Sequence, residues 1–261
     1  MIRLPISGGR ARWRPATGTD DIALADSQPG LAGALAHVAR TAVLSEDAGA
    51  PLDAGSLPVG DLDLLVVARR RELRGDALVA EGQCAQCASA VDVQFSLAAY
   101  ADHHRPREPR RVTRAEPGWY LLHSHEVSFR VPVVDDVLAA AGAENPRAAL
   151  LARCVRQPLS AKAARAVEQA MAALAPTLRA DVAGTCPDCS AAVLLDVDAR
   201  ELCMAELRFL AASVYDDVNL IASVYRWSQD AILDLPSARR RHYAHLIAGQ
   251  SAEPPVAVPV G

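Results

Sequence analysis

The chain has 261 residues and a formal net charge of −4, with 51% hydrophobic and 22% charged residues. This length allows one large domain or two moderate ones with a buried core, and the composition excludes a wholly disordered chain. The slightly negative balance gives no reason to expect a nucleic-acid-binding protein.

The sequence also lacks membrane and secretion signals. No stretch approaches the roughly 18 apolar residues of a membrane span, and residues 1–9 have no apolar core typical of a signal peptide. We therefore expect a protein of the cytosol. In that reducing compartment, cysteines are more often metal ligands or core residues than disulfides.

The first quarter of the chain predicts two helices separated by linkers. Residues 1–20 contain Gly and Pro and are interpreted as a flexible arm or an extended contact segment. Apolar residues at helical spacing predict a helix over 30–44. The Pro- and Gly-containing stretch 46–60 is interpreted as a linker, and Asp61 as the N-cap of a helix that ends near Leu73.

From Ala77 the period changes from helical to alternating, and 91–96 alternates as a half-buried strand does. The polar, arginine-rich segment 102–117 is expected to be a loop, and 119–131 a strand interrupted by a turn. Three helices are then predicted, the second opened by Asn145-Pro146 and the third by Ser160, at 133–142, 146–156 and 160–174.

The last third of the chain begins with a second alternating segment at 177–197. A single long helix is predicted over 199–225, followed by two short helices capped by Ser228 and Ser237. The Pro-rich tail after about residue 249 is expected to be disordered.

Two cysteine pairs form an internal repeat with an offset of 102 residues. Both copies follow the pattern G-x-C-x-x-C-x-x-A-V and continue into an alternating strand, so each is interpreted as a strand–knuckle–strand unit. The four cysteines are Cys84, Cys87, Cys186 and Cys189.

The spacing within each pair suits a metal ion. Two intervening residues form a tight turn that directs both thiolates to one point, and a structural zinc takes four such ligands in a closed tetrahedron. We therefore predict one structural zinc in a split zinc ribbon, with a subdomain inserted in the 98 residues between Cys87 and Cys186. Four cysteines leave no open position for catalytic water.

Other uses of the cysteines are weaker. A thioredoxin-like redox pair stands at a helix N-terminus, whereas both pairs here precede strands. Two separate disulfides conflict with the expected compartment. Cys154 and Cys203 lie in helical patterns and are interpreted as buried core thiols.

The remaining polar clusters are less specific. His123 and His125 share a strand face but have no partner at a metal-binding spacing, so we interpret them as solvated or hydrogen-bonded. The arginines of the 105–114 segment could contact phosphate, although a solvated or protein-contacting loop is favoured. The chain has no phosphate-binding, dinucleotide-binding, serine-hydrolase or zinc-protease motif.

The C-terminal segment Tyr225–Tyr243 predicts a helical cap. Trp227 is expected to anchor the bend after the long helix, with Ile232 and Leu235 packed inward. In the last helix, Tyr243 and Leu246 are expected to face inward, and the run from Arg239 through Arg240 to Arg241 is expected to be exposed.

The segment Leu57-Pro58-Val59-Gly60, the two cysteine pairs and the Tyr225–Tyr243 ending occur together in this order. In these features the chain resembles the T-even-type baseplate proteins, of the hub-assembly class, of contractile phage tails and phage-like contractile injection systems. It departs from their pattern at Ala85 and Ala88, which replace proline and glycine, and at Ser190, where glycine is usual. The resemblance implies a non-enzymatic role in baseplate assembly, either within the finished particle or as an assembly factor.

These observations predict a zinc-stabilised α+β protein. Its expected parts are an arm, helix and linker (1–60), a helix with the first knuckle (61–98), an inserted strand and helical subdomain (99–176), the second knuckle (177–198), C-terminal helices (199–248) and a disordered tail (249–261). A protein interface is expected at Trp227, Arg239, Arg240, Arg241 and Tyr243, because Trp, Tyr and Arg contribute much interface energy.

Partners are expected among baseplate, hub or tail-tube proteins, with no small-molecule substrate, nucleic acid or membrane span. The alternatives are a zinc-ribbon nucleic-acid-binding or transcription-associated module, which needs a basic stripe, and an enzyme with an unrecognised site, which needs a pocket with perturbed titratable groups.

Overall fold

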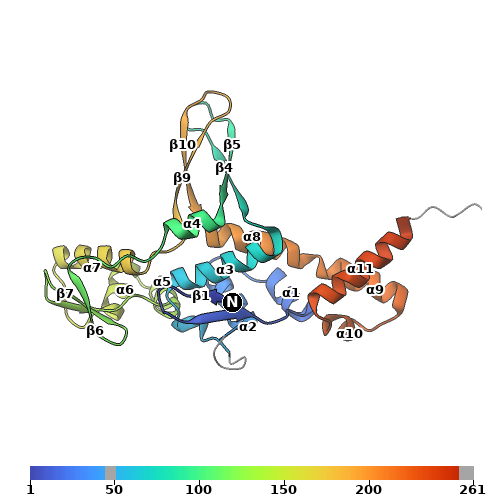
Figure 1. Ribbon diagram of the computed structural model, residues 1–261, viewed down its shortest axis with the longest axis horizontal. Helices are drawn as coiled ribbons and strands as arrows, with labels where there is room; N and C mark the ends of the chain where they lie inside the picture. Colours follow the sequence, from blue (N-terminus) through green and yellow to red (C-terminus); the bar gives the residue numbers. More distant parts are fainter. Residues whose placement is uncertain (45–50, 253–261) are drawn as a thin grey trace, which may run out of the picture.

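The computed structural model describes residues 1–44 and 51–252, with side chains described up to residue 249. It is a mixed α+β protein, as the sequence predicts. A central body carries three outward extensions: a pair of long hairpins, an inserted subdomain and a C-terminal helical unit (Figure 1).

The body packs helices against a small N-terminal sheet. Strands β1 (Ile2–Arg3), β2 (Arg10–Trp13) and β3 (Ala42–Leu44) pair antiparallel in that order. The helices of the body are α1 (Gly18–Ala25), α2 (Leu31–Thr41), the 3₁₀ turn η1 (Ala54–Ser56), α3 (Val59–Arg74) and α8 (Ala199–Ala212). Their apolar faces meet in the largest core cluster of the described chain, which includes Val38, Leu62, Leu65, Met204 and Leu207.

The hairpins that carry the cysteine pairs project from this body. The first is β4 (Ala77–Gln83) with β5 (Ala90–Ser96), and the second is β9 (Arg179–Thr185) with β10 (Ala192–Asp198). They rise side by side above α8 and the short helix α4 (Leu97–His103), as Figure 1 shows. We call these two hairpins, residues 77–96 and 179–198, the arm, a term that from here on does not refer to residues 1–20.

The chain between the hairpins packs around a core of its own. Strands β6 (Val112–Glu116), β7 (Trp119–Leu122) and β8 (Val127–Phe129) form an antiparallel sheet. The helices are α5 (Val134–Ala141), α6 (Pro146–Cys154) and α7 (Ala161–Leu174). Phe129, Cys154 and Val167 are fully buried in this second cluster. As expected, the side chains of Asn145 and Ser160 cap α6 and α7.

The C-terminal unit contains α9 (Val214–Tyr225), α10 (Gln229–Leu233) and α11 (Ser237–Ala252). A small cluster of Ile221, Ile232, Ala244 and Ile247 holds the three helices together. The prediction of a single helix over 199–225 is wrong, because the helix is interrupted at Ser213, between α8 and α9. The hydroxyl of Ser213 donates to the carbonyl of Leu210. Helix α11 includes residues 249–252 of the predicted tail, and the rest of that tail lies outside the described residues.

Arg240 corrects the expectation that the Arg239–Arg241 run is exposed. Its side chain is fully buried. Nη1 lies 2.8 Å from Asp21 of α1, and Nε donates to Asp217 of α9 over 2.9 Å. Arg240 shares one stripe of α11 with the buried Ala244 and Ile247, so helical periodicity turns it inward. Leu246, expected inward, is instead exposed.

The N-terminal expectations also need correction. Residues 1–20 are not a flexible arm, because they form β1, β2 and the start of α1, and Leu4 and Ala11 are buried. Helix α3 begins at Val59, with Pro58 rather than Asp61 at its N-cap. Part of the predicted linker 46–60 contributes buried Leu52, Ala54 and Leu57; its first residues lie outside the described chain.

Two elements were not predicted in the region 97–116. Ser96 opens α4 by accepting a hydrogen bond from the amide of Ala99, which a strand pattern running up to Ser96 conceals. The end of the predicted arginine-rich loop forms β6, which pairs with β7. Within the described residues, no helix is both long and apolar enough to cross a membrane.

Replacing Arg240 tests whether this ion pair holds the C-terminal unit to the body. We expect Arg240→Ala to lower the free energy of unfolding by about 3–5 kcal/mol, because Asp21 and Asp217 would keep buried charges without a partner. The neighbouring exposed residue supplies the control, and Arg239→Ala should change stability by about 0.5 kcal/mol or less. Urea unfolding followed by circular dichroism measures both. Equal, small effects of the two substitutions would contradict this role of Arg240.

Candidate metal centre

Each knuckle is a six-residue turn closed by two backbone hydrogen bonds. In the first, the amide of Cys84 donates to the carbonyl of Ser89 and the amide of Ala88 to that of Cys84, over 2.9 and 2.8 Å. The second turn has the same bonds from Cys186 to Ala191 and from Ser190 to Cys186, over 2.9 and 3.0 Å. The sequence repeat is therefore a structural repeat.

Both turns contain one residue in the left-handed region. Ala88 has φ 61° and Ser190 has φ 59°. These are the positions where the resembled family usually has glycine, which adopts this conformation without steric cost. Alanine and serine here cost about 1 kcal/mol each, and the closure of the turns must offset this.

The fold brings the four sulfur atoms together at the outer end of the arm. Sγ of Cys84 lies 3.6 Å from Sγ of Cys189, and Sγ of Cys87 lies 3.6 Å from Sγ of Cys186. All four ligand atoms lie within 4.8 Å of one another. Four thiolates about 2.3 Å from a central ion, at the corners of a tetrahedron, would be about 3.8 Å apart. The donor set and its spacing therefore fit a tetrahedral metal ion.

This geometry also bears on the two rival uses of the cysteines. All four are free thiols in this structure, and the close sulfur contacts run between the knuckles rather than within each pair. Each pair leads into a strand rather than a helix, so neither has the helix N-terminus that activates a thioredoxin-like thiol.

The two hairpins are related by an approximate twofold arrangement. A Cβ added at Gly82 would lie 2.5 Å from Leu195, and one at Gly184 would lie 2.4 Å from Val93. The offset of 102 residues converts one of these contacts into the other, because Gly82 corresponds to Gly184 and Val93 to Leu195. It converts the two short sulfur–sulfur contacts into each other in the same way. Glycine at both positions lets each hairpin's backbone lie directly against a side chain of the other.

The cluster is half covered. Cys84 and Cys186 are buried among Val91, Val93 and Val193, whereas Cys87 and Cys189 face solvent. The Ser89 hydroxyl, 3.3 Å from the Cys87 sulfur, and the Ser89 amide lower the pKa of the Cys87 thiol to about 6. A thiolate is the form of cysteine that binds metal.

Polar contacts fix the base of the arm to the body. The hydroxyl of Tyr100 in α4, the helix that follows the first hairpin, donates to the carbonyl of Val197 in the second hairpin over 3.2 Å. Asp63 of α3 accepts from the amide of Leu178 over 3.0 Å and from Arg200 over 2.9 Å. Burial raises the pKa of Asp63 to about 6, against the opposing effects of the Arg200 charge and these hydrogen bonds.

The N-terminus contains a third turn of this kind, which sequence analysis missed. The amide of Leu4 donates to the carbonyl of Gly9, and that of Gly8 to Leu4, both over 2.9 Å. Gly8 has φ 83° at the position of Ala88 and Ser190. Leu4 and Ser7 therefore occupy the places of the two cysteines. The Leu-Pro-x-Ser sequence, matched to Cys-Pro-x-Cys at 186–189, was the available signal.

In this third turn two backbone amides donate to a carboxylate from the body. Asp61 accepts from the amides of Ile6 and Ser7 over 3.1 and 2.8 Å. Burial raises the pKa of Asp61, and the hydrogen bonds from Ser7 and Ile6 oppose that rise. In the described chain this closed turn thus carries cysteines of the candidate metal centre in two copies and contacts a carboxylate in the third.

The other candidate residues do not assemble into a site. His123 contacts Thr113 and His125 contacts Ser124, over 3.0 and 2.8 Å. The four cysteines are the one group in the described chain that could hold a metal ion. Cys154 and Cys203 are fully buried, as expected of core thiols, and burial raises their pKa values to about 11 and 12.

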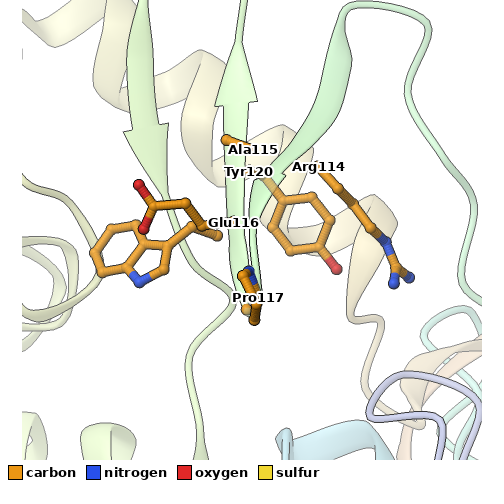
Figure 2. A pocket seen from close by; sticks show the side chains of 7 residues that line it. Arg114, Ala115, Glu116, Pro117 and Tyr120 are labelled. Carbon is orange, nitrogen blue, oxygen red and sulfur yellow. The ribbon is translucent and has the colours of Figure 1, made fainter.

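A pocket of about 270 Å³ lies at the β6–β7 turn, lined by residues 114–120 (Figure 2). Its charged groups already have partners. The Arg114 guanidinium lies over the ring of Tyr120, and Arg156 pairs with Glu116 over 2.9 Å while stacking 4.0 Å from Trp119. This arrangement stabilises a hairpin and presents no acid–base pair suited to catalysis.

The structure separates the residues of the predicted interface. Trp227 and Tyr243 lie together, with ring centroids 5.3 Å apart in an edge-to-face contact. Arg239 is exposed one helical turn before Tyr243 on α11. Arg240 is in the core, and Arg241 lines a groove toward Trp13 and Arg69 of the body.

Comparison with known protein families, curated proteins and solved structures finds no significant match to this chain.

Replacing one cysteine tests the cluster as a metal centre. We expect about one metal ion per purified chain, and Cys186→Ser should lose it and unfold or aggregate, because a structural metal contributes on the order of 10 kcal/mol to folding. Cys203→Ala, which removes a buried thiol outside the cluster, should retain the metal. Elemental analysis and thermal melting measure these outcomes. A folded, metal-free wild-type protein would contradict the assignment.

Replacing Gly82 or Gly184 by alanine should lower the stability of the protein by different amounts. Gly184→Ala should lower stability by about 1–3 kcal/mol, because Val93 is stiff at χ1 and has little room to move away. Gly82→Ala should cost less, since its neighbour is the flexible end of Leu195. Denaturant unfolding, together with the rate of metal loss to a chelator, would rank the two. The reverse order would contradict the packing described for the arm.

Proposed function

We propose that this chain is a non-enzymatic structural or assembly protein of a contractile phage-tail-like baseplate, stabilised by one structural zinc. The observation that carries the structural role is the closed donor set at the end of the arm. The four cysteine sulfurs lie within 4.8 Å of one another, and a tetrahedral ion that they bind would keep no position for water or substrate. Tetrahedral four-sulfur sites are typical of zinc in a ribbon.

The segments that carry the baseplate resemblance lie at junctions of the fold. Pro58 caps α3, and a Cβ added at Gly60 would lie 2.0 Å from the carbonyl oxygen of Pro176, where the chain returns from the inserted subdomain. The C-terminal segment supplies both the buried Arg240 and the exposed Trp227. This distribution supports a family fold in which the motif residues join the parts of a protein that acts through its surfaces.

The charge of the arm argues against the alternative of a nucleic-acid-binding ribbon. The arm holds six carboxylates and one arginine, a formal charge of −5 within a chain of −4. Glu81, Asp92, Asp181 and Asp188 are exposed. A divalent ion bound by four thiolates adds further negative charge. Such a surface repels phosphate, whereas a nucleic-acid-binding module needs a basic one.

The arginine-rich segment does not restore that alternative. Arg107, Arg110, Arg111 and Arg114 lie on the inserted subdomain, and Arg105 lines a pocket of the body with Arg3 and Arg71. The arm therefore lacks the basic stripe that the hypothesis of a nucleic-acid-binding module requires.

Co-assembly tests the proposed function. The zinc-loaded chain would be co-expressed with tail-tube, hub and sheath proteins encoded near it and purified through a tag on the chain. We expect it to co-purify with a hub or baseplate component, and sedimentation of finished particles would distinguish a permanent component from an assembly factor. The metal-free Cys186→Ser variant is the control for unfolding. A folded, zinc-loaded chain that associates with none of these proteins would overturn the proposal.

A further inference from the structure

Three aromatic rings form a cluster on the C-terminal unit. Tyr225 and Trp227 stack with ring centroids 5.3 Å apart and planes inclined by 28°. Tyr243 of α11 meets both rings edge-on, at 6.0 Å from Tyr225 and 5.3 Å from Trp227. Aromatic pairs in these geometries contribute about 0.5–1.5 kcal/mol each beyond the area that they bury.

Two of these rings, Tyr225 and Trp227, are exposed, whereas Tyr243 is half-buried against the core of the unit. Tyr225 and Trp227 are each 38% exposed, Val224 is 49% exposed and Leu246, one turn beyond Tyr243 on α11, is 45% exposed. The core of the unit consists of Ile221, Ile232, Ala244 and Ile247. We call these three rings, together with the exposed Val224 and Leu246 near them in the chain, the aromatic face.

The backbone between two of the rings adopts an uncommon conformation. Arg226 has φ 59° and ψ 25°, in the left-handed region that residues other than glycine seldom occupy. This residue is the C-cap of α9, where helices commonly end in the left-handed conformation, and its amide donates to the carbonyl of Ala222. Its neighbours Tyr225 and Trp227 stack across this turn.

The border of the aromatic face is basic. Arg226 and Arg239 are exposed, and neither has an ion pair among the described residues. Arg239 lies four residues before Tyr243 and seven before Leu246, so these three side chains share one stripe of α11. An apolar centre with unpaired cations at its edge complements an apolar surface bordered by carboxylates.

We propose that the aromatic face docks an amphipathic helix of a partner protein whose apolar stripe is flanked by Asp or Glu. Apolar side chains of that helix would cover Trp227 and Tyr243, and its carboxylates would pair with Arg226 and Arg239. Trp, Tyr and Arg are the residues that most often dominate binding energy at such surfaces. This proposal rests on the proposed function, since it names the partner chemistry of a protein that acts through its surfaces.

The test uses the full, zinc-loaded chain and two synthetic helical peptides. The peptides share one stripe of Leu and Phe and differ only in the flanking residues, which are Glu in one and Lys in the other. Fluorescence anisotropy should show the acidic peptide binding at least about tenfold more tightly. Trp227→Ala should weaken that binding about tenfold or more. Trp119→Ala, on the inserted subdomain, is the matched control and should leave it unchanged.

Reversing the charge of one exposed residue tests the binding preference without unfolding the chain. Arg239→Glu changes an exposed residue, so the chain should remain folded while its preference shifts toward the basic peptide. Equal binding of the two peptides, no binding of either, or an unchanged preference in Arg239→Glu would overturn the proposal. Self-association that disappears in Trp227→Ala, measured by sedimentation, would also overturn it, because the face would then bind a second copy. Co-assembly with baseplate proteins despite such a result would leave the proposed function standing.

Discussion

The arm depends on the contact between four sulfur atoms that two distant parts of the chain bring to one point. The hairpins also meet through a small apolar cluster, which includes Val93, Val193 and Leu195. A metal ion bound by the four cysteines would add a link between the hairpins at their outer ends. The 98 residues between the knuckles would then begin and end at one fixed point.

The recurrence of one turn clarifies what the metal adds. The same closed turn occurs three times, and only the two copies on the arm carry cysteines. The N-terminal copy lies against the body, where Leu4 enters the core and Asp61 accepts from its amides. A turn packed on the body can use a leucine and a carboxylate, whereas the two turns of the arm pack on a small apolar cluster of their own and carry cysteines that could hold a metal ion. The surroundings of each copy therefore account for its residues.

The sequence was informative where one periodic pattern determines a structure. The cysteine repeat, the alternating strands and the helices capped by Asn145 and Ser160 all follow local rules, and the structure has them. The N-terminal turn was hidden because its two cysteine positions hold Leu4 and Ser7. Arg240 was misplaced because a run of arginines suggests solvent, and its partners Asp21 and Asp217 come from separate helices. No local pattern marks a buried ion pair formed across the tertiary fold.

The position of Arg240 changes how the C-terminal resemblance should be understood. An arginine that joins α1, α9 and α11 is needed for the orientation of the whole C-terminal unit. Trp227, in the same segment, is exposed outside that core, and the half-buried Tyr243 packs against the core on one side and Trp227 on the other. One stretch of sequence thus contains both the residue that orients the unit and the residues that the unit presents. A substitution that abolishes partner binding in this segment would therefore identify an interface only if the melting temperature were unchanged, and that criterion separates Trp227 from Arg240.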